Sequence, residues 1–257
     1  MIIVLAGTRE GREICSRLQG AGQPVLASVT SSWGEALLKN QGVANIVQGN
    51  LSRAGLEELI RTEQASLIVD ATHPFAATIS QDAMDAAMER GIEYLRLERE
   101  PAALPEHPLI IRIQALKELE AYLETGQRLF STLGSKHLPA ILPIIRRKKA
   151  QLVARVLPHS AVLKSCEDLG LLPGQLIAMQ GPFSFSLNLE MFRHYGADLV
   201  ISKESGAYGG LETKAGAALE LGVPILVWSR PKLDYPRCFS SCQDLLAYIN
   251  NEERDRR

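Results

Sequence analysis

Short apolar runs alternate with amphipathic segments along this chain of 257 residues. A strand of a parallel sheet is covered on both faces, so it appears as a short apolar run, and the helix that follows has apolar positions three or four residues apart. In the first hundred residues this pattern predicts strands at 2–6, 24–29, 44–48, 67–70 and 94–97. It predicts helices at 9–19, 51–62 and 76–90. Such alternation is typical of a parallel sheet with helices on both faces.

The segment 98–108 interrupts the alternation. It holds Pro101, Pro105 and Pro108, and proline does not fit a helix interior. We place the boundary between two lobes there, at 1–100 and 101–257. Beyond it the pattern predicts strands at 109–113, 129–131, 152–155, 176–179, 199–202 and 225–228, and helices at 116–125, 185–195, 212–221 and 242–251. The predicted fold class is α/β, with two Rossmann-like lobes, each a mostly parallel sheet covered by helices, and with ligands in a cleft between them.

The charge balance limits the classes of partner. The chain has 28 Lys and Arg against 29 Asp and Glu, a formal net charge of −1, so neither nucleic acid nor an anionic membrane is expected as the main partner. The four cysteines form no Cys-x-x-Cys pair and no histidine lies at ligand spacing from them, which predicts free thiols and no metal site. The chain starts with an apolar strand rather than a signal peptide, and its longest apolar run, near 223–228, is too short to cross a bilayer. We therefore expect a cytoplasmic protein.

The turn after the first strand is the first candidate ligand site. Ligands of such sheets bind outside the carboxyl ends of the strands, where this chain has Gly7, Thr8, Arg9, Glu10 and Gly11. The turn lacks the full Gly-x-Gly-x-x-Gly fingerprint. It still combines a tight turn, backbone N–H groups at a helix N-terminus and a hydroxyl, which suits a phosphate. A simple strand-to-helix turn is the alternative interpretation.

The end of the second strand bears on the kind of dinucleotide. An NAD site usually has Asp or Glu there, about 20 residues after the glycines, to hold the ribose 2′-hydroxyl. This chain has hydroxyls instead, among them Ser28 and Thr30, and it has Arg9 and Arg12 in the adjacent turn. The pattern favours NADP(H) over NAD(H), with a plain polar loop as the alternative.

Two polar side chains follow the strand at 67–70. Thr72 and His73 stand before Pro74, which can open a helix at its first position. A lone histidine is often structural, but a strand's carboxyl end is where a catalytic group is expected. Both roles stay open for His73.

Three segments of the second lobe lie at equivalent strand ends. They are 179–184 with Gln180 and Ser184, 202–206 with Lys203, Ser205 and Gly206, and 229–231 with Arg230. Each alone is ordinary turn chemistry, but together they bring two cations and several hydroxyls to one sheet edge, which predicts an anion site. The basic run 146–149 is interpreted as a solvated face. The absence of a Gly-x-Ser-x-Gly elbow, a Walker A loop and a His-Glu-x-x-His helix argues against a serine hydrolase, a P-loop NTPase and a zinc protease.

Taken together, these motifs resemble the precorrin-6A reductase family of cobalamin biosynthesis. The segments that carry the resemblance span nearly the whole chain in family order: 5–11 (LAGTREG), 69–76 (VDATHPFA), 96–99 (RLER), 179–184 (MQGPFS), 203–206 (KESG) with 209–210 (GG), and 230–231 (RP). The segments 70–76 and 180–184 are specific, whereas the first turn alone is not. Two departures are visible: Ala6-Gly7 stands where the family usually has two glycines, and 130–134 differs at one position from a Thr-rich turn.

The resemblance implies reduction of one double bond of a corrin precursor by NADPH, from precorrin-6A to precorrin-6B. It implies that the first lobe binds NADPH, with contacts from Gly7, Thr8, Arg9, Glu10, Arg12, Ser28, Thr30 and Thr72. It implies that the substrate's acetate and propionate arms meet Arg96, Lys136, Gln180, Ser184, Lys203, Ser205, Gly206 and Arg230. Cations would fix these carboxylates by charge-assisted hydrogen bonds. The proton that completes the reduction would come from His73 or from water, and the product would pass to neighbouring enzymes of the pathway.

Two other classes stay open. The first is a nucleotide-sensing regulatory module without turnover, which the lack of a clear acid–base set permits. The second is a two-lobed α/β transferase, which would need a nucleotide-donor site in the second lobe. Consumption of NADPH in the presence of a corrin precursor separates the reductase from the sensor.

Overall fold

The computed structural model describes residues 1–205 and 209–255. The chain forms two compact units: unit 1 is Met1–Glu100 together with the chain from Pro231 onward, and unit 2 is Pro101–Arg230. The second lobe predicted from the sequence, 101–257, was therefore too long, because the last strand and the last helix pair and pack with unit 1. No helix of the described residues is long and apolar enough to span a membrane.

Unit 1 contains one six-stranded sheet. Its strands are β1 (Ile2–Leu5), β2 (Val25–Val29), β3 (Ile46–Gln48), β4 (Leu67–Asp70), β5 (Glu93–Leu97) and β12 (Cys238–Phe239). They pair in parallel in the order β12-β5-β4-β1-β2-β3. The helices are α1 (Arg9–Gly20), α2 (Ser32–Asn40), α3 (Arg53–Thr62), α4 (Ala77–Arg90) and α10 (Cys242–Asp255). The sequence pattern predicted all of these except α2 and β12.

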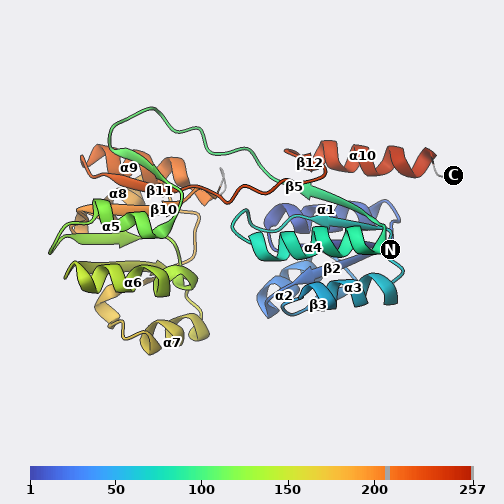
Figure 1. Ribbon diagram of the computed structural model, residues 1–257, viewed down its shortest axis with the longest axis horizontal. Helices are drawn as coiled ribbons and strands as arrows, with labels where there is room; N and C mark the ends of the chain where they lie inside the picture. Colours follow the sequence, from blue (N-terminus) through green and yellow to red (C-terminus); the bar gives the residue numbers. More distant parts are fainter. Residues whose placement is uncertain (206–208, 256–257) are drawn as a thin grey trace. The chain divides into compact units, whose positions relative to one another are not determined.

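Helices pack against the sheet of unit 1 (Figure 1), and a cluster of buried apolar residues lies on each face of that sheet. Val4 and Val69 face one way and pack with apolar residues of α1, α2 and α10. Ile3 and Ile68, their neighbours along the strands, face the other way and pack with α3 and α4. Both faces of the strands are thus buried, which is why these strands appear in the sequence as continuous apolar runs.

Unit 2 repeats this architecture. Its strands are β6 (Ile110–Ile113), β7 (Arg128–Ser131), β8 (Gln151–Val156), β9 (Leu176–Ala178), β10 (Leu199–Lys203) and β11 (Ile225–Trp228). They pair in parallel in the order β6-β11-β10-β7-β8-β9. Its α-helices are α5 (Leu119–Tyr122), α6 (Leu138–Arg147), α7 (Ser160–Asp168), α8 (Phe185–His194) and α9 (Leu211–Glu220), with 3₁₀ turns at Leu116–Glu118, Ser135–His137 and Pro173–Gln175. The predicted helix 116–125 is a 3₁₀ turn followed by the short α5, and the pattern did not predict α6 and α7.

The two sheets share one strand order. In unit 1 the order β3-β2-β1-β4-β5-β12 is the 3-2-1-4-5-6 order of dinucleotide-binding folds. In unit 2 the order β9-β8-β7-β10-β11-β6 is the same, except that the sixth position is taken by the strand that comes first in the sequence. The predicted fold class of two helix-covered parallel sheets is confirmed. Such sheets bind ligands where the strand order reverses, which is between β1 and β4 in unit 1 and between β7 and β10 in unit 2.

Candidate functional site

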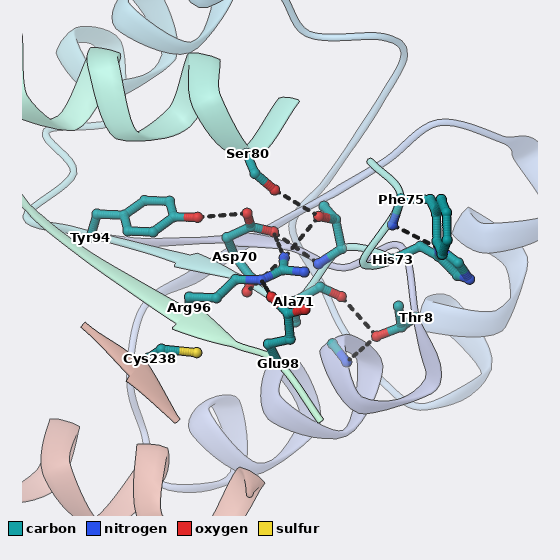
Figure 2. Close-up of polar contacts among 12 residues, drawn as sticks. Thr8, Asp70, Ala71, His73, Phe75, Ser80, Tyr94, Arg96, Glu98 and Cys238 are labelled. Atoms are coloured by element: carbon teal, nitrogen blue, oxygen red, sulfur yellow. Dashed lines mark hydrogen bonds and ion pairs between the residues drawn. The ribbon is translucent and has the colours of Figure 1, made fainter. Parts of the chain in front are cut away.

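Thr8 lies at the point of unit 1 where the strand order reverses, as the N-cap of α1 (Figure 2). Its Oγ1 accepts a hydrogen bond from the Gly11 N–H at 3.2 Å and donates one to the Ala71 carbonyl at 2.8 Å. Its proton is therefore engaged in tying α1 to the end of β4. Close packing is needed here, because a Cβ on Gly11 would lie 2.8 Å from the Ala6 Cα. A phosphate at this turn would meet the backbone at the N-terminus of α1 rather than the Thr8 O–H.

The rest of the first turn fits an anion. Gly7 is exposed, and a Cβ there would meet nothing closer than the Thr72 Cα at 3.9 Å, so the backbone is open to a ligand. Arg12 is partly buried, and its Nε has no hydrogen-bond partner among the described residues. Burial lowers the pKa of Arg12, and the charge of Arg9 lowers it further against the opposing effect of Glu10. A bound anion would give this partly buried guanidinium a charge-assisted hydrogen bond.

The other predicted contacts of this turn differ in their surroundings. The Glu10 carboxylate lies 2.9 Å from Arg99 Nε, so it forms an ion pair within the protein. At the end of β2, Thr30 is exposed, whereas Ser28 is 8% exposed and sits inside the strand. Thr30 is thus the accessible hydroxyl of the two.

Asp70 organises the end of β4 (Figure 2). Its buried carboxylate accepts hydrogen bonds from Arg96 Nη1 at 2.7 Å, from the Tyr94 hydroxyl at 2.7 Å and from the Thr72 N–H at 2.9 Å. Arg96 Nη1 also donates to Thr72 Oγ1 at 3.0 Å. The Arg96 side chain is 0% exposed, so it does not offer the substrate contact that the sequence suggested. In this structure Arg96 positions Thr72.

His73 follows this network directly. Its Nδ1 accepts a hydrogen bond from the Phe75 N–H at 3.2 Å (Figure 2). This contact puts the proton of a neutral imidazole on Nε2. His73 is half-buried, and its ring lies 5.8 Å from the Phe75 ring. The turn therefore holds the imidazole as an Nε2–H donor.

Unit 2 brings Lys203 and Lys136 together. Lys203 ends β10 and is half-buried, and burial followed by the charge of Lys136 lowers its pKa to about 8. His137 packs against Trp228 with 4.9 Å between ring centroids. Burial, then Lys203 and Lys136, lower the pKa of His137 to about 4, so it is neutral at pH 7. Lys203 and Lys136 thus place positive charge at this sheet edge.

This edge also contains a carboxylate that the sequence analysis did not single out. Glu204 is buried, forms an ion pair with Arg112, and accepts the Arg230 backbone N–H at 3.4 Å. Ser205 is buried beside it, and Gly206 lies outside the described residues. The carboxylate of Glu204 therefore offsets part of the positive charge at the anion site predicted from Lys203 and Arg230.

Gln180 and Ser184 occupy the loop between β9 and α8. Gln180 is exposed. Ser184 is the N-cap of α8, where its Oγ accepts the Leu187 N–H at 3.2 Å. Capping of α8 is thus a structural role for Ser184.

A cavity of about 310 Å³ lies within unit 2, at the carboxyl ends of its strands. Its lining includes Thr132, Gly134, Arg155, Phe183, Gly209 and Lys214. Thr132 repeats one contact of Thr8, because its Oγ1 donates to a carbonyl of the neighbouring strand, that of Ile201 on β10, at 3.0 Å. Arg155 and Lys214 are cations that sequence reasoning missed. The signal for Arg155 was a charge inside an otherwise apolar strand.

Fold and site define a class: an α/β protein of two Rossmann-like units with cationic side chains at the ends of its strands. The chain matches the model of the family described as precorrin-6x reductase CbiJ/CobK over residues 1–250. The protein belongs to this family, as its motifs suggested.

Individual relatives agree with this. The chain is 36% identical to the cobalt-precorrin-6A reductase of Methanothermobacter thermautotrophicus, over 99% of this chain and 85% of the relative. It is 32% identical to the precorrin-6A reductase of Rhodococcus erythropolis, over 90% of each. A solved structure described as CobK precorrin-6A reductase is similar with a TM-score of 0.79 at 23% identity, covering 97% of this chain and 96% of that one. This last likeness supports the fold.

Proposed function

We propose that this protein is an NADPH-dependent reductase that converts precorrin-6A, or its cobalt form, into precorrin-6B. The observation that carries the proposal is the family match over residues 1–250, together with relatives that are named for this reaction and aligned along most of their length. A sensor without turnover or a transferase would not account for those names.

Unit 1 is the proposed NADPH unit. Its support is the open backbone at Gly7, the N-terminus of α1 and the Nε of Arg12, which has no hydrogen-bond partner in the described part of the chain. The sequence also has no acidic side chain at the end of β2. When bound, NADPH supplies a hydride to one carbon–carbon double bond of the macrocycle. Arg9 and Arg12 would pair with the 2′-phosphate, and Thr30 would face the ribose.

Unit 2 is proposed to take the carboxylate arms of the substrate. Lys203, Lys136 and Arg230 stand at one sheet edge, and charge-assisted bonds from them would fix the orientation of the macrocycle. With a pKa of about 8, Lys203 keeps most of its charge at neutral pH. The contribution of the protein is orientation and exclusion of water, since the hydride chemistry belongs to the cofactor.

His73 is the proposed source of the proton, from Nε2 of its imidazolium form. Loss of that proton leaves a neutral ring, and protonation of Nδ1 requires that its contact with the Phe75 N–H be released. General acid catalysis is worth about 10²–10⁴-fold in rate, whereas one neutral hydrogen bond is worth about 1 kcal/mol, roughly fivefold. We expect His73→Ala to lower kcat by more than about a hundredfold with NADPH binding unchanged. His107 is a matched control, because its Nδ1 accepts the Leu109 N–H at 3.2 Å at an exposed site, and His107→Ala should leave kcat unchanged. A loss under tenfold for His73→Ala would assign the proton to water.

The reaction itself is tested by anaerobic incubation with NADPH and either metal-free or cobalt-bound precorrin-6A, followed by absorbance and mass. We expect loss of NADPH absorbance and a product heavier by the elements of H₂. The relatives carry both substrate names, so both forms are needed. Binding of NADPH without reduction of either form would contradict the reductase and favour the sensor.

A further inference from the structure

Two cations of unit 2 are buried without a counter-charge. Arg155 is 6% exposed and Lys214 is 8% exposed, and both line the cavity of about 310 Å³. Neither forms an ion pair with any carboxylate that the structure describes. The sequence at 206–208, outside the described residues, is Gly-Ala-Tyr and has no acidic side chain. Buried charges are normally paired, so this arrangement calls for an explanation.

Arg155 is fixed by neutral groups. Its guanidinium lies over the Phe183 ring, 3.9 Å from the centroid, and Nη1 donates to Asn188 Oδ1 at 2.8 Å. Asn188 is held in turn, because its Nδ2 donates to the Ser184 carbonyl at 2.9 Å. Burial lowers the pKa of Arg155 to about 10, which leaves it charged at neutral pH. Neutral groups thus orient the guanidinium of Arg155, and no described carboxylate forms an ion pair with it.

Lys214 is held in a similar way. Its Nζ donates to the Gly209 carbonyl at 2.7 Å and lies 3.5 Å from Ser202 Oγ. Burial, then the charges of Arg155 and Lys203, lower its pKa to about 7. The positive charges of Arg155 and Lys203 thus disfavour the charged form of Lys214, and a bound anion would favour it.

Two glycines belong to the lining of the cavity. Gly209 and Gly210 line it at the start of α9. A Cβ on Gly209 would lie 1.8 Å from Ser205 Oγ, and Gly210 has a φ of 63°, so both positions favour glycine. The N-terminus of the ten-residue α9 opens on the same space and adds its positive end.

We propose that this cavity is an oxyanion-binding subsite, in which Arg155 and Lys214 recognise a phosphate or a carboxylate. The inference goes beyond the proposed function, which gave the anions of unit 2 to Lys136, Lys203 and Arg230, and these three do not line the cavity. Phosphate would come from a nucleotide and carboxylate from an arm of the substrate, and the recognition chemistry is the same for both.

Calorimetric titration of the full chain with inorganic pyrophosphate and with tricarballylate tests the proposal without any turnover. We expect saturable binding of at least one of them, and the tighter one identifies the source as phosphate or carboxylate. Lys214→Met and Arg155→Gln should each weaken that binding by about tenfold or more. Lys117→Met removes an exposed lysine of the same unit and should have no effect. Absence of binding by both anions, or equal binding by the variants, would overturn the proposal.

Thermal unfolding gives an independent readout, which does not depend on the reductase assignment. Lys214→Met removes the contact with the Gly209 carbonyl whether or not Lys214 binds an anion, so the informative quantity is the rise in Tm on adding the anion. That rise should be clear in the unmodified protein and lost in Lys214→Met. If Lys214 served only to hold the Gly209 carbonyl, the same change would lower the Tm but leave the rise on adding the anion unchanged. That outcome would also overturn the proposal.

Discussion

Replacing Asp70 by Asn should destabilise unit 1 strongly, although the two side chains have the same shape. Asp70 is the closest counter-charge of Arg96, which is 0% exposed, and it also accepts the Tyr94 hydroxyl and the Thr72 N–H. Asn keeps the hydrogen-bonding carbonyl and removes the charge. Arg96 then stays buried with only Glu98, whose Oε2 lies 3.4 Å from Arg96 Nε.

The magnitude follows from these contacts. Removing one partner of a buried ion pair costs about 3–5 kcal/mol, because the other charge is left uncompensated. Glu98 is 13% exposed and remains near the guanidinium, which favours the lower end, about 3 kcal/mol. At about 2–4 °C per kcal/mol, the Tm should fall by about 6–12 °C.

Thermal and urea unfolding of Asp70→Asn measure this loss. Asp85→Asn is the matched control, since Asp85 is 31% exposed and lies 3.5 Å from Arg53 at the surface, so its loss should cost under about 1 kcal/mol. The double variant Asp70→Asn with Arg96→Met should recover part of the stability, because no unpaired charge is left inside. A loss under about 1 kcal/mol for Asp70→Asn would refute the reasoning.

Three further outcomes are expected. NADPH should bind at least tenfold tighter than NADH, a difference in binding free energy of about 1.4 kcal/mol, and Arg12→Ala should reduce this difference. Equal affinities for NADPH and NADH in direct titrations of the unmodified protein would contradict the cofactor assignment. The value of kcat/KM for the corrin precursor should fall as the pH rises through about 8, because Lys203 then loses its charge. The same pH profile in Lys203→Met would show that Lys203 does not cause this fall. Gly11→Ala should lower the free energy of unfolding in urea by about 1–3 kcal/mol, since its Cβ would lie 2.8 Å from the Ala6 Cα. Gly20→Ala on the same helix should leave that free energy unchanged, because a Cβ there would meet nothing within 4 Å. Equal effects of the two variants would refute the packing argument.

The parallel sheets could be predicted because burial of both faces produces plain apolar runs. The missed elements lack a comparable signal. The helix α6 places Leu138, Ile141 and Ile145 at helical spacing, but Pro143 stands inside it and argues against a helix in the sequence. Only Leu38 is buried in α2, and β12 is two residues long, so neither has an apolar pattern to recognise.

The sequence indicates which residues follow the ends of strands. It does not indicate which residues lie opposite each other on neighbouring strands of the sheet. Thr72 follows a strand end, and its Cα would lie 3.9 Å from a Cβ on Gly7, in the turn after β1. Arg96 was expected at a ligand, but the register between β4 and β5 sets it directly opposite Asp70, and no sequence pattern reveals a register between strands. Arg155 was taken as the last residue of a strand at 152–155, whereas β8 continues to Val156 and places the charge in its buried interior.

The position of β12 at the far end of the chain has a consequence for how the protein is made. The first five strands of unit 1 leave the ribosome first, but β5 pairs with β12, which is synthesised only after all of unit 2. All six strands of unit 2 lie in one uninterrupted stretch of the chain, so its sheet can form completely before β12 is synthesised. The sheet of unit 1 still lacks its edge strand at that stage. Translation that stops at Arg230 would therefore leave the later unit whole and the earlier one unfinished.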